Sequence, residues 1–413
     1  MGKENKVPAI RFEGFSGEWE AKCLGDIGSL KNGMNFGKEA MGHGYPFINL
    51  QDVFGKNEVN NSNLGLAFST LNQRKEYSLN AGDVLFIRSS VKPEGVGEAA
   101  VISKSLENTT YSGFIIRFRP NIEMNINFNR FVYSTINSRK QILASSTSSA
   151  NSNINQEALQ RIQLYLPYKQ EQTKIGKYFQ QLDTLIAQHQ QKHDKLLNLK
   201  KSLLEKMFPK QGATEPDIRF KGFSGAWEEK ALGDDVADII GGGTPSTNIT
   251  EYWDGDIDWY SPTEIGNQVF ANGSVKKITK LGLEKSSATV LPANNTVLFT
   301  SRAGIGYMAI LKKDGSTNQG FQSFVVKNGY DTYFIYSAGN LIKKYALKHA
   351  SGSTFLEISG KQLSQMEIKT PCLDEQTKIG TLFKNLDSLL NQHQTQLKKL
   401  ENIKQACLAK MFV

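Results

Sequence analysis

Residues 10–26 read IRFEGFSGEWEAKCLGD, and residues 218–234 read IRFKGFSGAWEEKALGD. Thirteen of these 17 positions are identical, at an offset of 208 residues. A second pair of blocks, EQTKIGKYFQQLDTLIAQHQ at 171–190 and EQTKIGTLFKNLDSLLNQHQ at 375–394, agrees at 13 of 20 positions. Internal repeats decide the organisation of a chain before any other feature does. The sequence is therefore a duplication, with one long insert between the repeated blocks of each copy.

The two inserts, about residues 27–165 and 235–370, have similar lengths but do not align convincingly except near their ends. Short β-branched runs follow turn residues in both, as in VLFI at 84–87 and TVLF at 296–299. Such runs, punctuated by Gly-rich loops, predict short strands. The inserts therefore read as mixed α/β domains.

The EQTKIG blocks predict two long helices, because apolar side chains recur at steps of three and four. Each block follows a proline and contains none, and residues 170–208 would span roughly 60 Å as a helix at about 1.5 Å per residue. A helix of that length needs a partner, and the simplest one is the other copy in an antiparallel pair. The stripe expected in this pair comprises Ile175, Phe179, Leu182, Ile186, Ile379, Phe383, Leu386 and Leu390.

We therefore expect an α+β protein in which two mixed α/β domains are separated by two long antiparallel helices. The duplication predicts pseudo-twofold symmetry. The expected boundaries are 1–168 for the first domain, 169–210 for the central helix, 211–370 for the second domain and 371–413 for the C-terminal helix.

The composition is that of a globular protein: 413 residues, 39% hydrophobic, 22% charged and a formal net charge of +9. No apolar run approaches the roughly 18 residues of a membrane span, and the first residues, MGKENKVPAI, lack the apolar stretch of a secretory signal. Three scattered cysteines indicate neither a disulfide scaffold nor a zinc ribbon. We expect a cytoplasmic protein that makes no contact with a membrane.

The positive charge is concentrated in the two expected helices, which hold +7 of the +9. Phosphate neutralisation supplies most non-specific affinity for DNA, so a chain that coated DNA alone would have strongly basic domains. If DNA is the target, tight binding should need additional protein, and the inserts should read bases more than they supply charge. The alternative is that lysines such as Lys192 and Lys200 form the solvated face of an amphipathic helix.

The arrangement resembles the specificity subunit of a type I restriction-modification system. The resemblance is carried by F-x-G-F-S-G-x-W at 12–19 and 220–227, and by P-x-x-x-E-Q-x-x-I at 167–175 and 371–379. It also rests on GGTPS at 242–246, followed by YW at 252–253 and IDWY at 257–260. The first insert departs from the pattern, because KNGMNFG at 31–37 stands where the second insert has its glycine cluster.

The resemblance implies a non-catalytic subunit with two target recognition domains, each reading one half of a split, gapped sequence in duplex DNA. It further implies a hetero-oligomer in which this chain positions two modification (methyltransferase) subunits, and restriction subunits that translocate DNA, for adenine methylation or cleavage. S-adenosylmethionine, ATP and Mg²⁺ would then be bound by those partners, and this chain would hold no cofactor.

Motifs of the corresponding enzymes are missing from the sequence. There is no Pro-Pro pair for the adenine-binding loop of a methyltransferase, and none of the five Gly-Lys pairs is followed by Ser or Thr as in a P-loop. A loose nuclease-like pattern remains in Asp217, Glu228 and Lys230, which could hold Mg²⁺ through carboxylates. The first copy has Ala9 in place of the aspartate, which favours a structural segment.

His189 and His193, one helical turn apart, could chelate a metal ion. The second helix has Leu397 in place of the second histidine, which favours polar positions in a helical seam. Besides DNA recognition, two alternatives remain open at this point. One is an interaction scaffold of two ligand-binding modules joined by a helical pair, and the other is a Mg²⁺-dependent nuclease.

Candidate DNA contacts lie in the inserts. Arg302 follows a predicted strand and leads into a glycine loop, and Arg88 follows the matching strand of the first insert. An arginine in such a place can contact guanine O6 and N7 or bind phosphate. For every candidate, an exposed loop residue without a binding role is the alternative. Further candidates are Arg74 and Lys92 in the first insert, and Thr244, Ser246, Tyr260, Ser261, Gln319 and Gln322 in the second.

Overall fold

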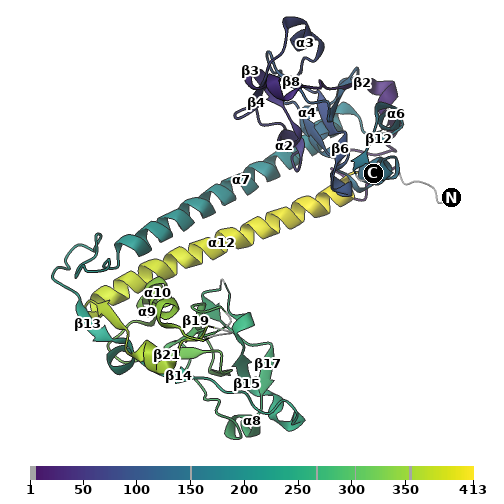
Figure 1. The fold of residues 1–413 in the computed structure, drawn as a ribbon. Coiled ribbons are helices and arrows are strands. Elements are labelled where there is room, and N and C mark those ends of the chain that lie inside the picture. The colour runs from purple at the N-terminus through teal and green to yellow at the C-terminus, as the bar shows by residue number, and fades with distance from the viewer. Residues whose placement is uncertain (1–5, 149–150, 267, 303, 353–355) are drawn as a thin grey trace. The chain divides into compact units, whose positions relative to one another are not determined.

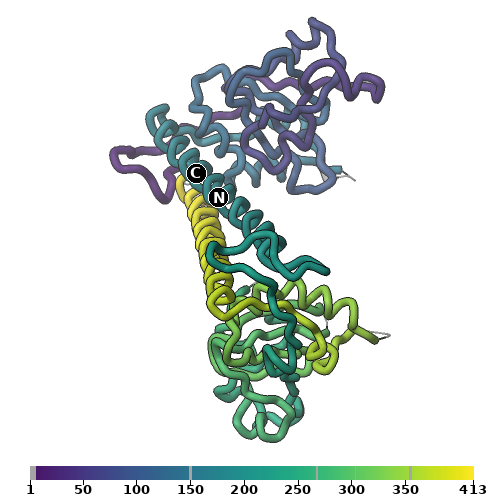
Figure 2. Tube along the Cα trace, turned by 90° about the vertical axis from the view of Figure 1, so that its left-hand side faces the viewer, coloured from purple at the N-terminus to yellow at the C-terminus, as the bar shows by residue number. Residues whose placement is uncertain are grey.

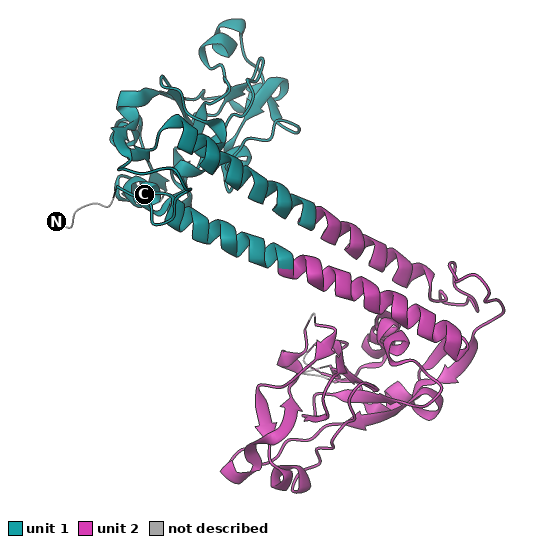
Figure 3. Cartoon of the chain, turned by 180° about the vertical axis from the view of Figure 1, so that it is seen from behind, with its two compact units in different colours: residues 1–189, 396–413 teal, residues 190–395 magenta. Residues whose placement is uncertain are grey.

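The computed structural model describes residues 6–148, 151–266, 268–302, 304–352 and 356–413. The chain divides into two compact units, Met1–His189 with Gln396–Val413 and Gln190–Thr395 (Figure 3). Two long helices, α7 (Lys169–Lys206) and α12 (Leu373–Met411), each begin in one unit and end in the other (Figure 1). In the described part of the chain, no helix is both long enough and apolar enough to cross a membrane.

The first unit is built on a four-stranded antiparallel sheet in the order β2-β9-β5-β7. A second sheet has the order β4-β3-β8, with β3 antiparallel to β4 and parallel to β8. Two smaller sheets, β1-β12 and β10-β11-β6, complete the unit. Its strands are β1 (Glu20–Cys23), β2 (Gly28–Asn32), β3 (Met41–Ile48), β4 (Gly65–Ala67), β5 (Val84–Ile87), β6 (Ser89–Ser90), β7 (Ala99–Val101), β8 (Thr110–Tyr111), β9 (Ile115–Pro120), β10 (Thr147–Ser148), β11 (Ser152–Asn153) and β12 (Gln163–Leu166).

The second unit has a five-stranded sheet in the order β14-β21-β18-β19-β16 and a three-stranded sheet in the order β17-β15-β20. In the latter, β15 is antiparallel to β17 and parallel to β20. A two-stranded sheet, β13-β22, closes the insert. Its strands are β13 (Glu228–Ala231), β14 (Ala237–Gly241), β15 (Trp253–Tyr260), β16 (Phe270–Ala271), β17 (Lys276–Ile278), β18 (Thr296–Phe299), β19 (Met308–Leu311), β20 (Gly315–Thr317), β21 (Gln322–Val326) and β22 (Glu367–Thr370).

The duplication extends through the inserts, although their sequences do not show it. The order β2-β9-β5-β7 of the first unit recurs as β14-β21-β18-β19 in the second, and β4-β3-β8 recurs as β17-β15-β20. The central strands β3 and β15 even share a register shift, between Met41 and Tyr45 in one and between Trp253 and Ile257 in the other. The prediction of two mixed α/β domains is confirmed.

Short helices cover the sheets, and several begin with a side chain that accepts a hydrogen bond from the first turn, as a good N-cap does. Asn125 caps α4 in this way, and Asp331 caps α9. The first unit contains α1 (Leu24–Ile27), η1 (Lys38–Ala40), α2 (Leu50–Val53), α3 (Leu71–Glu76), η2 (Pro93–Gly95), α4 (Ile126–Val132), α5 (Ile136–Ala144) and α6 (Gln156–Gln160). The second contains η3 (Leu232–Val236), η4 (Thr250–Tyr252), η5 (Pro262–Glu264), α8 (Lys280–Glu284), α9 (Thr332–Ser337), α10 (Gly339–His349) and α11 (Gly360–Ser364).

Each unit packs its core around the beginning of one long helix and the end of the other. In the first unit, Phe179 of α7 lies in one apolar cluster with Trp19 and with Phe412, which directly follows α12. Figures 1 and 2 show this last part of α12, in yellow, against the first unit. In the second unit, Phe383 of α12 shares a cluster with Trp227 and Phe208. This explains why both copies end in Lys-Met-Phe: the phenylalanine anchors the helix end beside a tryptophan.

In each unit, an ion pair between a partly exposed arginine and a buried glutamate joins the two repeated blocks. The Arg11 guanidinium donates to both carboxylate oxygens of Glu171, at 2.6 and 2.7 Å, and to the carbonyl of Gly17 at 2.6 Å. Arg219 makes the same bonds to Glu375, at 2.7 and 2.8 Å, and to Gly225 at 2.5 Å. The hydrogen bond to each carboxylate raises the pKa of the arginine. We call these two pairs the clamps, because each fixes a helix start to the block before the insert.

The remaining letters of the EQTKIG motif also have structural roles. The Gln172 side chain donates to the Pro167 carbonyl at 2.9 Å and accepts from the Asn125 backbone at 3.1 Å. Gln376 does the same with Pro371 and Asp331. The motif therefore fixes the start of each long helix to the short helix that packs beside it.

Candidate nucleic-acid interface

One loop of the second unit, residues 317–321, makes backbone hydrogen bonds to residues at the ends of several strands. The Gly243 amide donates to the Thr317 carbonyl at 2.9 Å, and the Asn318 amide donates to Tyr260 at the end of β15 at 3.0 Å. The Ser301 amide, just after β18, donates to Gly320 at 2.8 Å. The loops after β14, β15 and β18 therefore meet at residues 317–321. We call this group the second loop cluster.

Two glycines of the run at 241–243, Gly242 and Gly243, are required by close approaches of the backbone. A Cβ on Gly242 would overlap the carbonyl oxygen of Asn318, and one on Gly243 would lie 2.5 Å from the Ser287 carbonyl carbon. The Trp259 indole nitrogen donates to the Gly243 carbonyl at 2.8 Å and fixes the loop from its other side. The glycines therefore position the residues that follow them, starting with Thr244.

Three predicted residues come together in this cluster. The Thr244 hydroxyl is hydrogen-bonded to the Gln319 side chain, and both residues are exposed. Gln322, at the start of β21, pairs with Gly241 of β14. Their hydroxyl and amide groups can hydrogen-bond to base edges.

Arg302 and Ser261 belong to strand-end loops of the same cluster. The Arg302 side chain is 34% exposed, and its Nη1 lies 4.0 Å from a Glu357 carboxylate oxygen. An ion pair with this long a distance between its atoms and this much exposure to solvent is weak, so the guanidinium is available to a ligand. The Ser261 hydroxyl donates to Glu264 at 2.9 Å and helps to cap η5.

Tyr260 and Ser246 have structural contacts. Tyr260 is 1% exposed and lies in an apolar cluster with Leu291 and Phe321, and burial raises the pKa of its hydroxyl to about 12. The ring therefore belongs to the core of the unit. Ser246 is exposed, and its carbonyl accepts a hydrogen bond from the Trp253 indole at 3.1 Å.

The first unit builds the same loop from different side chains. The Met34 amide donates to Tyr111 at 2.8 Å, and the Ser112 amide donates to Ile48 at the end of β3 at 3.0 Å. The Arg88 amide donates to Phe114 at 2.8 Å. Gly33 takes the place of Gly242, because a Cβ there would overlap the Ser112 carbonyl oxygen. We call this group, centred on residues 111–115, the first loop cluster.

Comparing these backbone hydrogen bonds shows which residue of the first cluster is equivalent to which residue of the second. Arg88 has the position of Ser301, and Phe114 has that of Gly320. Arg302 therefore matches Ser89, so the two arginines predicted from the sequence stand one position apart in otherwise equivalent loops. The Arg88 Nη1 donates to the Gly113 carbonyl at 3.4 Å, which places the guanidinium at the loop.

Arg74 and Lys92 stand outside these backbone contacts. The Arg74 guanidinium stacks over the Tyr45 ring at 3.6 Å and donates to Asn108 at 3.2 Å. Lys92 is exposed at the start of η2, where its amide donates to the Ser90 hydroxyl at 3.2 Å. Arg74 is thus engaged within its own unit, whereas the Lys92 side chain is accessible.

Two residues of the first cluster escaped the sequence reasoning. Phe114 is 57% exposed at the tip of the loop. Asn35 lies beside the preceding Gly113, since a Cβ on Gly113 would overlap the Asn35 side-chain oxygen. The Ser-Gly pair before an apolar run, at Ser112 and Gly113, was the available signal for a turn that presents the next side chain.

The stripe of the long helices is buried where each helix meets a domain core. Ile175, Phe179 and Leu182 are buried in the first unit, and Ile379, Phe383 and Leu386 are buried in the second. Ile186 and Leu390 are half-buried.

The helix lysines include two with a packing role. Lys404 pairs with Asp183 at 2.7 Å in the first unit, and Lys200 pairs with Asp387 in the second. Each of these pairs joins α7 to α12. Part of the helix charge is therefore used between the helices.

The charged residues of the nuclease-like pattern form ion pairs, either with one another or with Lys210. Asp217 accepts from Lys210 at 2.5 Å, and Glu228 from Lys230 at 2.8 Å, which lowers the pKa of that glutamate. The His193 Nδ1 atom lies 3.4 Å from the Oδ1 atom of Asp194. Within the described residues, no group of three or more His, Cys, Asp or Glu is placed to hold a metal ion.

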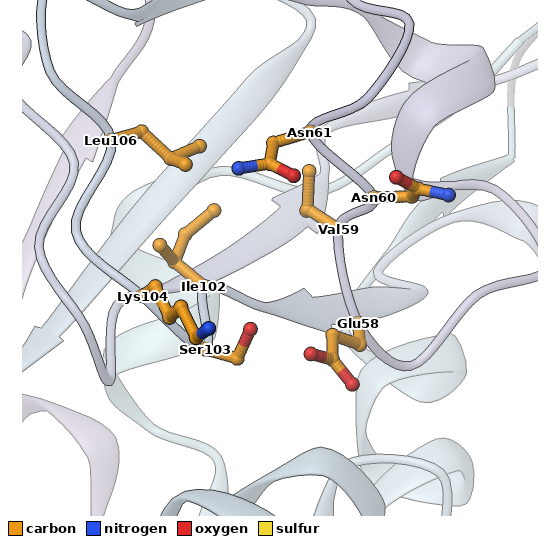
Figure 4. Close-up of a pocket in the computed structure, with 8 residues that line it drawn as sticks. All are labelled: Glu58, Val59, Asn60, Asn61, Ile102, Ser103, Lys104 and Leu106. Carbon is orange, nitrogen blue, oxygen red and sulfur yellow. The ribbon is translucent and has the colours of Figure 1, made fainter.

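A pocket of about 430 Å³ in the first unit has a polar lining that includes Glu58, Asn60 and Lys104 (Figure 4). It lies next to the end of β7, and Val101 there pairs with Val84 at the start of β5. The first loop cluster lies at the opposite end of β5. The pocket is therefore separate from the candidate interface.

The family model of the type I restriction modification DNA specificity domain matches residues 16–198 and 225–402. The two matches cover most of the chain and fall once in each copy of the repeat. The chain belongs to this family, and the resemblance seen in its motifs is confirmed.

Relatives of known name are specificity subunits. The type I restriction enzyme MjaIX specificity subunit of Methanocaldococcus jannaschii is 36% identical over 181 residues, which are 43% of this chain and 41% of that relative. The matched segment thus spans about two fifths of that protein. The HindI specificity subunit of Haemophilus influenzae is 23% identical over 464 residues, 93% of this chain and 97% of the relative.

The fold as a whole has a solved counterpart. The crystal structure of the S subunit of a type I restriction-modification system from M. genitalium is similar with a TM-score of 0.64 and 15% sequence identity. The similarity covers 98% of this chain and 99% of that one. At this identity the likeness concerns the fold.

Proposed function

We propose that the protein is the specificity subunit of a type I restriction-modification system and that it reads a split sequence in duplex DNA. The observation that carries the proposal is the loop cluster that is built twice on the same sheet order with different side chains. Two loop clusters with equivalent backbone contacts and different side chains are what a protein needs to recognise two different DNA sequences. In this proposal the chain recognises DNA and performs no catalysis itself.

The two long helices would act as the spacer between the readers. The beginning of α7 and the end of α12 share one core, and the end of α7 and the beginning of α12 share the other. These contacts support an antiparallel pair with pseudo-twofold symmetry. A target read by such a protein has two specified elements and an unread gap between them.

The proposed partners are two copies of a modification subunit and, for cleavage, restriction subunits. The repeated blocks offer equivalent surfaces for two identical partners, because Lys174 lies over the Phe15 ring at 4.9 Å and Lys378 lies over Phe223 at 4.7 Å. In this proposal, S-adenosylmethionine, ATP and Mg²⁺ belong to those partners. DNA phosphates would be neutralised mainly by the assembled complex, since the inserts of this chain carry little net charge.

The test is a genome-wide map of N6-methyladenine by single-molecule sequencing, in the source cell with and without this gene. Loss of one split, gapped motif on deletion, with recovery on complementation, is the expected result. An unchanged map in a cell whose partner methyltransferase is shown to be expressed would contradict the proposal. A scaffold of two ligand-binding modules would then become the better explanation.

A further inference from the structure

Phe114 is an exposed aromatic residue in an otherwise buried stretch. The side chains of Tyr111 and Ile115, on either side of it, are 0% exposed, whereas Phe114 is 57% exposed. A large apolar side chain in contact with water contributes nothing to the core of its own unit. In the first loop cluster, this side chain is therefore available for contact with a partner outside the unit.

The loop that carries Phe114 is fixed by its backbone. The Phe114 carbonyl accepts from the Arg88 amide at 2.8 Å, and its own amide donates to the Ser112 hydroxyl at 3.3 Å. The neighbouring Gly113 amide donates to Met34 at 2.7 Å. The ring is thus presented by a preorganised loop, which reduces the entropy lost when a ligand binds.

Two side chains that lie against Gly113, the residue before Phe114, are of the kinds that read bases in the major groove. Arg88 reaches the Gly113 carbonyl at 3.4 Å, and the Asn35 side-chain oxygen lies against Gly113. Arginine pairs with guanine O6 and N7, asparagine with adenine N6 and N7, and an apolar side chain contacts the thymine C5-methyl group. The first loop cluster therefore brings all three kinds of side chain together from three segments of the chain.

The second unit has no counterpart of this ring. The backbone bonds that place Phe114 in the first cluster place Gly320 in the second, beside Gln319 and Thr244. Any contact that Phe114 makes is consequently confined to one half of a split target. This asymmetry supplies an internal control.

We propose that Phe114 contacts the C5-methyl group of a thymine in the first half-site, with Arg88 and Asn35 reading neighbouring base edges in the same groove. This inference rests on the function proposed above and adds a chemical readout to it. It assigns the first unit a preference for thymine over cytosine, and over uracil, at one position.

The test uses the assembled complex with its methyltransferase partner and duplexes that carry the mapped target. Each thymine of the first half-site is replaced in turn by uracil, which pairs identically and lacks the methyl group. Wild-type binding should weaken by about fourfold at one position, as expected for the loss of one buried methyl contact. The same replacement in the second half-site should show no dependence on Phe114.

The variant Phe114→Gly, which introduces the residue of the second unit, should bind thymine and uracil duplexes equally. Phe114→Leu keeps an apolar side chain and should retain most of the difference. Leu71→Ala on α3 is the matched control, because Leu71 is also 57% exposed and lies outside the loop cluster.

The outcomes separate this inference from the proposed function. A wild-type complex that binds no split sequence specifically would contradict the function. A complex that binds its target but ignores uracil at every thymine would overturn the role of Phe114, and so would a first half-site without thymine on either strand. A Phe114→Gly complex that keeps the uracil effect would overturn it as well.

Discussion

Arg11 and Glu171 illustrate how one buried pair holds two distant parts of the sequence together. Glu171 is 0% exposed, and both its oxygens are occupied by the same guanidinium. Removing the arginine leaves a carboxylate buried without its countercharge, which is costlier than the loss of a surface pair. The duplicated motif is therefore explained by a duplicated electrostatic requirement.

We expect Arg11→Ala to lower the free energy of unfolding of the first unit by about 3–5 kcal/mol. Arg219→Ala should affect the second unit in the same way, because its pair with Glu375 is equivalent. Hydrogen exchange resolved by residue measures the two units separately. Lys6→Ala is the control: Lys6 lies 3.9 Å from Glu18 in an exposed pair, for which a change of at most about 1 kcal/mol is expected. If Arg11→Ala lowered the free energy of unfolding by an equally small amount, the stabilising role of the Arg11–Glu171 pair would be contradicted.

The first turns of each long helix contain a glycine, although helix propensity alone would favour another residue there. A Cβ on Gly176 would lie 2.6 Å from the Asn125 side-chain oxygen and 2.7 Å from the Phe128 amide nitrogen. On Gly380 it would overlap the Asp331 carboxylate. The packing of α4 and α9 against these helices thus requires the absence of a side chain.

Gly176→Ala should therefore destabilise the first unit by about 1–3 kcal/mol, since the added methyl group overpacks the contact. Intrinsic propensity predicts the opposite sign, because alanine is favoured over glycine by roughly 1 kcal/mol inside a helix. Urea denaturation of the variant decides between the two. Thr184→Ala, at an exposed position of the same helix, should change stability by no more than about 0.5 kcal/mol.

The helices and the helix stripe were predictable because their periodicity is local. Ile175, Phe179 and Leu182 were assigned from spacing alone to a seam between the two helices; all three are buried, in the core cluster of the first unit. The common sheet order of the inserts was not predictable, because loops of different length separate the matching strands. Val84 of β5 and Val297 of β18 pair with equivalent residues and are 213 positions apart, whereas the loop residues Phe114 and Gly320 are 206 apart.

The candidate interface shows a similar limit. The glycine run before Thr244 was visible in the sequence as part of a motif, and the structure supplies the carbonyl oxygen that requires Gly242. The Ser112-Gly113 pair indicated a turn before Phe114, but it did not distinguish this residue from a core phenylalanine, since its exposure depends on strands far away in the sequence. Tyr260 shows the reverse case: a polar tyrosine near a motif that proves to be buried.

For the whole molecule, the proposal of two separable readers predicts that base contacts can be changed one half-site at a time. Arg302→Ala should relax recognition in the second half-site only, at a cost of roughly 1–3 kcal/mol in discrimination if the guanidinium pairs with guanine. Methylation of a library randomised in both half-sites is the measurement. Lys285→Ala, at an exposed position just after α8, is the control. Equal loss in both half-sites would contradict separable readers.

The spacer role predicts that helix length sets the unread gap. Inserting four residues after Ala187 and four after Gln396 lengthens each helix by about 6 Å, roughly one turn. The preferred gap should then grow by about one to two base pairs, because the duplex rises 3.4 Å per pair. Replacing four residues at the same places without a change of length should leave the gap unaltered. An unchanged gap in the longer protein would rule out the spacer.

The equivalent clamps of the two units also bear on how such a protein can evolve. Each insert is bounded by the same antiparallel strand pair, β1 with β12 or β13 with β22, and by the same Arg–Glu contact. Homologous recombination between the coding segments of the repeated blocks would exchange a whole insert without disturbing either junction. A lineage could thereby acquire a new epigenetic pattern in a single genetic event while keeping the partner proteins it already has.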